Sequence, residues 1–572
     1  MSENPYILGL SALLHDPAAA LLGPDGNTVA AIEESKLVRA RDVTGIPREA
    51  IRFCLERAKI SWRDVKCVGI ASRPGRSWLR TAAFRMRQLP RAPIASGYYL
   101  SKGFGELGRE FNNLRILKTL AGSPGPAITT IGHQHCHAAS AFFCSPFDRA
   151  LVICFDERGD GECGIAAVGE ETKLRPITTL RFPNSIAWVY SQVTELLGYK
   201  PHSDEHKLQW LSFSGSPVFE NAFLHLLQRK PGAAPHLDRA YFQRGYTGRL
   251  AFSQDFCRQI GVDAANPKSI TEENKFNIAA SLLQACQKVV VEYAAALREK
   301  YQIENLCLAG GLFLNPLIVS AVEKNTGFKT VFVQPAAGNE GTALGAALSI
   351  WHEHQKGPRV APLASLYLGP SFSNDEIKRV LDNSKAAYQW INSDEEKIVE
   401  TVRLLQAGKI IAWFQGAAEF GPRALGNRSL LASPWAPYVR ENLNDYVKHR
   451  ESFRPFALSI ADDDCDKFFD APISARFMAS MSTARPEARD IMKSFLLPGD
   501  RVRLHVVERS SNPLFWQLLK RSGANAPAPL LVNTSFNLFG EPLVVTPRDA
   551  IRSYFCSGTD ALVIGNFILK KS

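Results

Sequence analysis

The chain has 572 residues, 45% of them hydrophobic, and a formal net charge of +11. The length exceeds what one hydrophobic core supports, and the composition excludes a chain with a large disordered share, so two or three globular domains are expected. The eleven cysteines include no Cys-x2-Cys pair, the first residues carry no basic export signal, and no apolar run is long enough to span a bilayer, so we expect a cytoplasmic protein.

The first predicted elements are three short strands. They cover Tyr6–Ser11, Ala18–Leu22 and Thr28–Ile32 and form an antiparallel meander. His15 and Asp16 fall in the turn between the first two strands, so both side chains are expected at the edge of the sheet. An Asp-Pro pair alone is an ordinary turn, and only the other candidate site residues of the chain make His15 and Asp16 functional candidates.

A strongly basic segment lies between Arg73 and Lys118, where ten basic residues face only two acidic ones. We expect helices inserted here between two sheet-forming regions. The basic residues are Arg73, Arg76, Arg80, Arg85, Arg87, Arg91, Lys102, Arg109, Arg115 and Lys118. A solvated helical face explains the segment better than a docking surface for an anionic acceptor or partner, which stays open as the alternative.

His133 and His137 stand four residues apart at the start of an Ala-rich helix, which places both imidazoles on one face. Two neutral imidazoles can share one divalent ion, although such a pair alone is more often structural. Asp156 ends a buried strand and would add a carboxylate. Asn339 or Glu340, between a later strand and helix, would supply the fourth ligand. Mixed nitrogen and oxygen donors suit iron, manganese or zinc rather than a thiolate zinc site.

A long helix is predicted from Asn274 to Leu297, followed by a strand that ends in two glycines. Such a turn lets backbone amides approach a phosphate or nucleoside, although one glycine pair is a weak signal. Gly310, Gly311 and Asn315 are therefore assigned to a nucleotide or acceptor cleft. A Pro-containing stretch without periodicity predicts a linker at 356–370, between domains at 1–355 and 371–572.

Cationic and amide side chains gather in the C-terminal part, next to strand-like segments. A guanidinium group on a rigid frame keeps its charge and binds two phosphate oxygens at once. Each arginine alone is more often a salt-bridge partner, but four clusters together favour a cavity for a polyanion. The clusters are Arg423 with Arg428, Lys448 to Arg454, Arg501 with Arg503, and Asn533 to Asn537.

Six motifs in this order resemble the O-carbamoyltransferases of antibiotic and nodulation-factor biosynthesis, over nearly the whole chain. They are Gly9-Leu-Ser-x3-His15-Asp16, His133-x3-His137-Ala-Ala-Ser-Ala-Phe, Gly310-Gly-x3-Asn315, Phe420-Gly-Pro-Arg-Ala-Leu-Gly-Asn-Arg-Ser, Phe453-Arg-Pro-Phe-Ala and Asn533-Thr-Ser-Phe-Asn-x2-Gly-Glu-Pro. The resemblance implies an α/β fold with two parts. An actin-like ATPase (ASKHA) domain related to the tRNA threonylcarbamoyltransferases would be followed by a YrdC-like domain.

The resemblance also implies a reaction in two steps. The YrdC-like domain would join carbamoyl phosphate and ATP, with Mg²⁺, into carbamoyl adenylate. The N-terminal domain would then move the carbamoyl group to a hydroxyl of a small natural-product acceptor, with Fe²⁺ or another divalent ion in its site. No membrane partner is expected, nucleic acid is disfavoured, and a homodimer stays open.

Residue roles follow from the same resemblance. His133, His137, Asp156 and Asn339 match metal ligands, and Arg39, Arg41, Arg423, Arg454, Arg503, Asn533 and Ser535 match contacts to carbamoyl phosphate and ATP. His15 matches a histidine beside the acceptor, and a general base is our hypothesis for it. Lys448 is a further cation, and together with Arg503 it completes the predicted catalytic set.

The sequence departs from the family pattern near the acceptor and the metal. Asn339 stands where the family has Asp, which leaves the identity and occupancy of the metal open. The segments after Asp156 and Asp204 differ as well, and the match at Arg503 can shift by one residue. Two other functions therefore stay open. One is adenylate-dependent acyl transfer to tRNA, and the other is non-catalytic binding by a chain with a degenerate N-terminal site.

Overall fold

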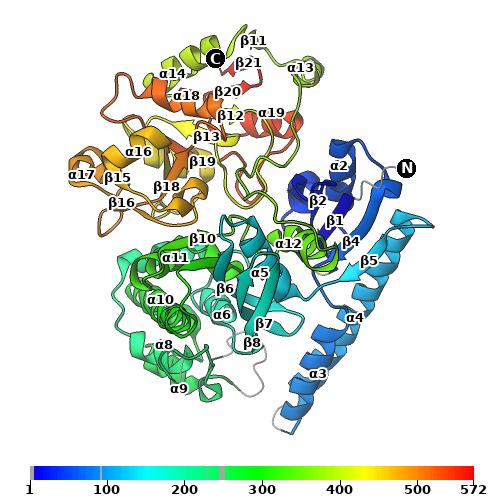
Figure 1. Cartoon of the computed structure of the whole chain (residues 1–572). Helices are drawn as coiled ribbons and strands as arrows, with labels where there is room; N and C mark the ends of the chain where they lie inside the picture. The colour runs from blue at the N-terminus through cyan, green and yellow to red at the C-terminus, as the bar shows by residue number, and fades with distance from the viewer. Residues whose placement is uncertain (1–5, 14, 91–92, 228–229, 244–251, 572) are drawn as a thin grey trace. The chain divides into compact units, whose positions relative to one another are not determined.

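The computed structural model describes residues 6–13, 15–90, 93–227, 230–243 and 252–571 (Figure 1). Arg91 of the basic segment lies outside these residues, as do the side chains of Arg85 and Arg87. The chain forms two compact units. Unit 1 comprises Met1–Thr28, Thr44–Arg48 and Lys59–Pro362, and unit 2 comprises Val29–Val43, Glu49–Ala58 and Leu363–Ser572. The boundary between Pro362 and Leu363 lies within the stretch predicted as a linker, 356–370, although two N-terminal segments group with unit 2. The domain limits at 1–355 and 371–572 stay a prediction.

Unit 1 contains two sheets that repeat one topology. In each, a central strand has an antiparallel neighbour on one side and two successive parallel neighbours on the other. In the first sheet these four strands have the order β2 (Ala18–Leu22), β1 (Tyr6–Ser11), β4 (Val65–Ile70) and β5 (Ala127–Thr130). In the second sheet the corresponding order is β7 (Glu162–Glu170), β6 (Arg149–Gly159), β9 (Asn305–Ala309) and β10 (Thr330–Val333). The second sheet also contains β8 (Lys173–Arg181), which pairs with β7. Actin-like ATPase folds have this repeat, so the predicted α/β class and N-terminal architecture are confirmed.

Two helices of unit 1 pack very closely because glycines line their contacts. A Cβ atom on Gly345 of α12 (Gly341–Ser349) would lie 1.9 Å from the carbonyl oxygen of Cys136 in α5 (His133–Cys144). A Cβ on Gly9 of β1 would lie 2.0 Å from the carbonyl oxygen of Ala343. Glycine therefore lets α12 lie directly against both α5 and the first sheet, and this contact fixes the position of the helix that carries the two histidines.

The remaining helices of unit 1 match the predicted pattern of inserted and connecting helices. The basic segment forms α3 (Arg76–Gln88) and α4 (Pro93–Ala121), which lie side by side in Figure 1, and the predicted long helix is α10 (Glu272–Tyr301). The others are α6 (Ile186–Leu196), α7 (Glu205–Leu211), α8 (Glu220–Leu227), α9 (Gln254–Gln259) and α11 (Pro316–Asn325). Among the residues described, no helix combines the length and apolar character that crossing a bilayer requires.

Unit 2 is built on a mixed sheet of eight strands with the order β11-β21-β20-β12-β13-β19-β14-β18. Its strands are β11 (Gln389–Trp390), β12 (Ile411–Phe414), β13 (Arg428–Ala432), β14 (Ala457–Ala461), β18 (Leu504–Val507), β19 (Leu531–Ser535), β20 (Ala561–Ile564) and β21 (Phe567–Lys570). Alternate residues of β12 enter two different hydrophobic clusters, so both faces of the sheet are covered. A YrdC-like relationship of this unit stays a prediction.

Helices on both faces complete unit 2. Leu381 of α13 and Tyr554 of α19 belong to one cluster, and Val402 of α14 and Phe515 of α18 belong to the other. The bounds are α13 (Asn374–Asn383), α14 (Asp394–Gln406), α15 (Val439–Glu441), α16 (Asp462–Phe468), α17 (Pro486–Met492), α18 (Pro513–Ser522) and α19 (Pro547–Phe555). The unit also holds most of β3 (Thr28–Glu33), α1 (Glu34–Val38), α2 (Arg48–Ala58) and a small sheet of β15 (Phe469–Asp470), β16 (Ser482–Ala484) and β17 (Arg501–Val502).

Candidate metal centre and anion site

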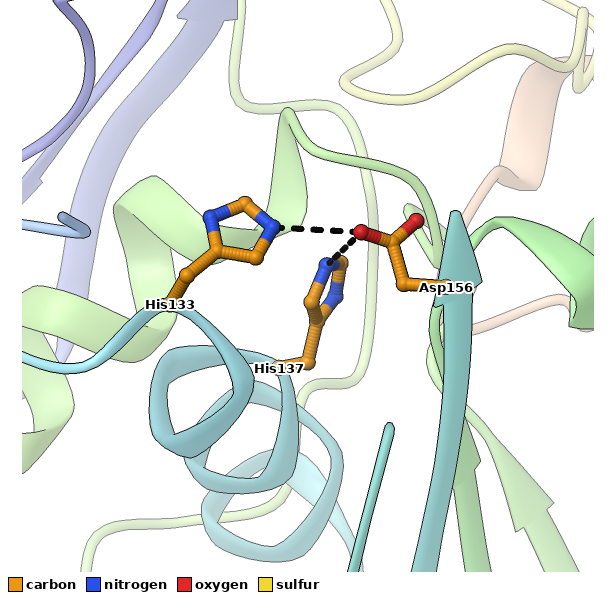
Figure 2. A group of neighbouring side chains, drawn as sticks. All are labelled: His133, His137 and Asp156. Atoms are coloured by element: carbon orange, nitrogen blue, oxygen red, sulfur yellow. Dashed lines mark hydrogen bonds and ion pairs between the residues drawn. The ribbon is translucent and has the colours of Figure 1, made fainter. Parts of the chain in front are cut away.

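Three of the predicted metal ligands meet in unit 1. Figure 2 shows His133 and His137 reaching from the first two turns of α5 toward Asp156 on β6. The Nε2 atoms of His133 and His137 lie 3.3 Å and 3.8 Å from Oδ2 of Asp156. The potential ligand atoms all lie within 4.8 Å of one another, so one ion can contact all three side chains.

The backbone around α5 fixes the orientation of His133. Its ring Nδ1 lies 3.2 Å from the carbonyl oxygen of Ala71, so a proton on Nδ1 leaves the lone pair of Nε2 directed at Asp156. The carboxylate of Asp160 accepts hydrogen bonds from the backbone N–H groups of His133 and Arg73, both at 2.9 Å. An anion at this end also stabilises the helix, because its first N–H groups carry partial positive charge. Sequence reasoning did not assign Asp160, whose partners are distant in the chain.

Asp156 is held by the glycine turn that was predicted to line a cleft. The backbone N–H of Gly311 donates to Oδ1 of Asp156 at 3.4 Å, which leaves Oδ2 for the two imidazoles. Gly310 has φ +94, and a Cβ atom there would lie 2.2 Å from the carbonyl oxygen of Phe155. Asn315 caps α11, accepting from the backbone N–H of Leu317 at 3.0 Å. The structure thus places the glycines at the metal carboxylate, and their part in a nucleotide or acceptor cleft stays a prediction.

The electrostatics of the three residues favour a bound cation. Burial raises the pKa of Asp156, but the hydrogen bond with His133 and the proximity of both imidazoles outweigh burial and hold it well below its usual range. Burial lowers the pKa of His137, which keeps that imidazole neutral near pH 7. Burial opposes the charge on His133 as well, but its hydrogen bond to Asp156 raises its pKa overall. An anionic oxygen beside a neutral imidazole is the protonation state that metal binding requires.

His15, Asp16 and Asn339 form a polar group beside these ligands. Nδ1 of His15 lies 3.0 Å from Oδ2 of Asp16, and Nδ2 of Asn339 donates to the same carboxylate at 3.2 Å. A proton on Nδ1 therefore points to Asp16 and leaves Nε2 of His15 as the acceptor. The hydrogen bond with Asp16 raises the pKa of His15 despite opposition from burial. The side chain of His15 remains 57% exposed, so a substrate can reach it.

The residues present fit a divalent ion. Among the described residues, neither ring nitrogen of His137 has a hydrogen-bond partner, and the buried Oδ1 of Asn339 has none either. Burial lowers the pKa of His137, and the nearby Asn339 side chain offsets only a small part of this effect. Two imidazole nitrogens, one carboxylate and one amide oxygen are a donor set for Fe²⁺, Mn²⁺ or Zn²⁺. That these four residues bind a metal stays a prediction.

Lys448 is the centre of the cation group in unit 2. It is 7% exposed and lies at the end of the helical turn Asn442–Lys448. Its Nζ donates to the carbonyl oxygen of Ser535 at 2.7 Å and to Oδ1 of Asn537 at 2.5 Å. Both acceptors are neutral. Burial, together with the charges of Arg450, Arg454 and Arg41, places the pKa of Lys448 well below its usual range.

Arg503 extends this group of cations. Burial lowers its pKa, and the charges of Arg423, Arg450 and Arg454 lower it further. Burial, followed by the charge of Arg454, lowers the pKa of Arg450 to about 9, although the carboxylate of Glu451 opposes this effect. The sequence analysis included Arg450 in the cluster from Lys448 to Arg454 but gave it no individual role. Mutual repulsion among these cations indicates a place where an anion with several charges would be strongly stabilised.

Asn533 and Ser535 lie on β19 near these cations. Nδ2 of Asn533 donates to Oγ of Ser459 at 3.0 Å and to the carbonyl oxygen of Ala424 at 3.3 Å, next to Arg423. Within the described residues, its buried Oδ1 has no hydrogen-bond partner. Oγ of Ser535 accepts from Lys448 at 3.2 Å. Both predicted residues are therefore in position to contact a ligand of the cation group.

Two predicted phosphate-binding arginines have protein partners, and one further arginine is buried. Arg39 donates to Oε2 of Glu541 at 2.8 Å and lies 3.7 Å from Asp549, so carboxylates already balance its charge. The exposed Arg41 donates only to the carbonyl oxygen of Glu541, at 3.3 Å, among the contacts described. Arg428 is fully buried and donates to four carbonyl oxygens while it stacks on Phe414 at 3.6 Å. Arg428 is a structural residue, and Arg41 is better placed than Arg39 to meet a phosphate.

Comparison with known proteins links both units to one family of transferases. The family model described as "Carbamoyltransferase N-terminus" matches residues 6–348, and "Carbamoyltransferase C-terminus" matches residues 402–571. The uncharacterized protein sll1178 of Synechocystis sp. is 34% identical, over 99% of this chain and 97% of its own length. Nodulation protein NolNO of Sinorhizobium fredii is 31% identical, over 98% and 80%.

A third relative carries a chemical name. The 3'-hydroxymethylcephem-O-carbamoyltransferase of Amycolatopsis lactamdurans is 29% identical over 52% of this chain and 54% of its own length. Among solved structures, full-length HypF in the phosphate- and nucleotide-bound form is 14% identical, covers 60% of this chain and 55% of that chain, and has a TM-score of 0.30. A TM-score of this size adds nothing to the sheet topology described above.

Proposed function

The chain belongs to the carbamoyltransferase family, and from this we propose that it makes carbamoyl adenylate from carbamoyl phosphate and ATP and transfers the carbamoyl group to a hydroxyl of a small-molecule acceptor. The family assignment supports the group that is transferred. The name of the cephem-modifying relative supports a hydroxyl oxygen as the acceptor atom. The identity of the acceptor is left open in this proposal. The segments after Asp156 and Asp204, near the predicted acceptor site, differ from the family pattern, so the acceptor of a relative cannot be transferred to this chain.

The observation that carries the proposal is the group of cations around Lys448 and Arg503. The described acceptors of Lys448 are neutral oxygens, and its charged neighbours are arginines. A ligand with several phosphate charges would relieve this repulsion, and carbamoyl phosphate and ATP together supply such charges. Fixed cations stabilise charge as it moves between phosphate oxygens, which is what exchange of one anhydride for another requires.

The first step would consist of two successive bond exchanges. Carbamoyl phosphate loses its phosphate to water, and the carbamate so formed stays bound. A carbamate oxygen then bonds to the α-phosphorus of ATP while the bond to pyrophosphate breaks. Lys448, Arg454 and Arg503 would neutralise the negative charge that passes to pyrophosphate, with Mg²⁺ on the nucleotide. Asn533 and Ser535 would orient the carbamoyl group through hydrogen bonds.

The second step would take place in unit 1. The acceptor oxygen bonds to the carbamoyl carbon, its proton passes to Nε2 of His15, and AMP leaves with the bonding electrons. Asp16 holds His15 in the required tautomer and stabilises the protonated ring. His133, His137, Asp156 and Asn339 would hold a divalent ion, whose contribution when bound is Lewis-acid polarisation of the carbonyl group.

Mass spectrometry tests the first step directly. We expect purified protein with ATP, Mg²⁺ and carbamoyl phosphate, and without acceptor, to form carbamoyl adenylate. Arg503→Ala should abolish the product, because the remaining cations cannot replace its charge. Arg379→Ala removes an exposed arginine of α13 and serves as the matched control, with wild-type activity expected.

Two outcomes would contradict the proposal. A folded, metal-loaded protein that forms no adenylate would favour a different acyl donor or a binding function. Equal activity of Arg503→Ala and Arg379→Ala would mean that the cation group is not the adenylation site.

A further inference from the structure

The segment after Ser535 ends in a tight turn with an aromatic residue at its tip. The backbone N–H of Glu541 donates to the carbonyl oxygen of Leu538 at 3.2 Å, and Gly540 between them has φ +79. These are the features of a type II turn, in which Phe539 takes the first central position. Phe539 is 64% exposed, so no hydrophobic core accounts for its side chain.

Side-chain hydrogen bonds and ion pairs hold the base of this turn in place. Nδ2 of Asn537 donates to the carbonyl oxygen of Glu541 at 2.7 Å and closes the loop. Lys448 donates to Oδ1 of Asn537 at 2.5 Å, and Arg39 and Arg552 donate to the Glu541 carboxylate at 2.8 Å and 2.5 Å. Three cations therefore fix the turn, and a rigid support lowers the entropic cost of binding through its tip.

The tip also lies within reach of the cation group. Phe539 lies two positions after Asn537, a span of at most about 7 Å in extended chain. Asn537 contacts Lys448 directly, and Arg41 donates to the turn at the carbonyl oxygen of Glu541. An exposed aromatic ring beside positive charges is suited to a ligand with a polyphosphate tail and a flat aromatic group. A nucleoside triphosphate has both.

We propose that Phe539 stacks on the adenine base of ATP while the cations around Lys448 bind the triphosphate. The inference rests on the proposed function, since it concerns the same nucleotide, and it adds a base-binding residue that the cation group alone does not supply. A single exposed phenylalanine needs no explanation on most surfaces. Here the rigid turn and the neighbouring cations distinguish it from the others.

The test compares ATP with inorganic tripolyphosphate, which has the charge but no base. Dissociation constants for both are measured on the full-length protein by calorimetry, with Mg²⁺ and without carbamoyl phosphate. Phe539→Ala should weaken ATP binding about tenfold and leave tripolyphosphate binding unchanged. Phe539→Tyr keeps an aromatic face and should bind ATP like the wild type. Phe555→Ala removes another exposed phenylalanine of unit 2, 53% exposed, and should change neither constant.

Each other outcome has a definite meaning. If Phe539→Ala binds ATP as tightly as wild type, or weakens both ligands equally, Phe539 does not stack on the base, and the proposed adenylation is untouched. If the wild-type protein binds neither ligand, the proposed nucleotide site is wrong and this inference is wrong with it.

Discussion

His137 and Asn533 each present buried polar atoms that have no hydrogen-bond partner among the described residues. A buried polar atom without a partner costs about 1 to 3 kcal/mol. Ligand binding can recover that free energy, so such atoms mark places where a ligand is expected. One lies among the predicted metal ligands of unit 1 and the other near the cations of unit 2, which is where the two proposed half-reactions require ligands.

The amide at position 339 should limit metal affinity. Asn339→Asp would place a second carboxylate beside Asp156, and its negative charge would attract a divalent ion more strongly than an amide dipole. We expect the metal dissociation constant to fall by about tenfold or more, measured by competition with a chelator. Asn325→Asp makes the same change on α11, away from the ligands, and should leave the constant unaltered. Equal affinities for all three proteins would exclude residue 339 as a ligand.

Buried His505 should make unit 2 sensitive to acid. Burial lowers its pKa to about 3, whereas an unfolded histidine titrates near 6.5. Between these values the unfolded chain binds a proton that the folded chain does not. Stability is therefore complete above pH 6.5 and falls toward pH 3, by up to about 1.4 kcal/mol per pH unit. Urea unfolding at several pH values should show this slope, and His505→Gln should flatten it. An unchanged slope in the variant would assign the acid sensitivity to other groups.

At the level of secondary-structure elements, α5 depends on its contact with α12. The Cβ of Gly345→Ala would collide with the carbonyl oxygen of Cys136, one residue before His137. We expect a loss of about 1 to 3 kcal/mol in unfolding free energy, and weaker metal binding because both histidines shift. Gly108→Ala is the matched control on α4, where an added Cβ meets no atom within 4 Å, and it should be neutral or slightly stabilising. Wild-type metal binding by Gly345→Ala would show that α5 tolerates the displacement.

Periodicity and spacing predicted the elements well but not their distant partners. The four-residue spacing of His133 and His137 on a helix predicts their common face, and the structure confirms that they meet Asp156. No local pattern indicates that Arg39 pairs with Glu541, because 502 residues separate them. The same holds for Gly311, whose backbone N–H donates to Asp156, 155 positions away, although its assignment to a cleft stays a prediction. Such contacts depend on which elements the fold brings together, and that information is not local.

For the molecule as a whole, the predicted ligand sets divide cleanly between the two units. The metal ligands and His15 belong to unit 1, whereas Lys448 and Arg503 belong to unit 2. The two proposed steps should therefore fail independently of each other. Each unit holds its own side chains through contacts within that unit, so a substitution in one set leaves the other set intact.

Two variants test this independence. Arg503→Ala should form no carbamoyl adenylate but should still carbamoylate an acceptor when adenylate is supplied. His137→Ala should form adenylate and fail in transfer. Mass spectrometry of both products distinguishes the steps once an acceptor is known, and hydroxyl-rich candidates can be screened with the wild-type protein. A variant that loses both steps while folded would contradict the division between the units.

The N-terminal segment Val29–Val43 belongs to unit 2, and this affects how the gene can recombine. Lys36 donates to the carbonyl oxygens of Glu419 and Gly421, both at 2.7 Å, and Glu33 accepts from the backbone N–H of Gly421 at 2.9 Å. A gene fragment that encodes only residues 363–572 would lack these partners and leave the Phe420–Ser429 motif without its support. The C-terminal half therefore cannot pass between genes as an independent cassette, and recombination within this lineage should preserve the two halves as a single reading frame.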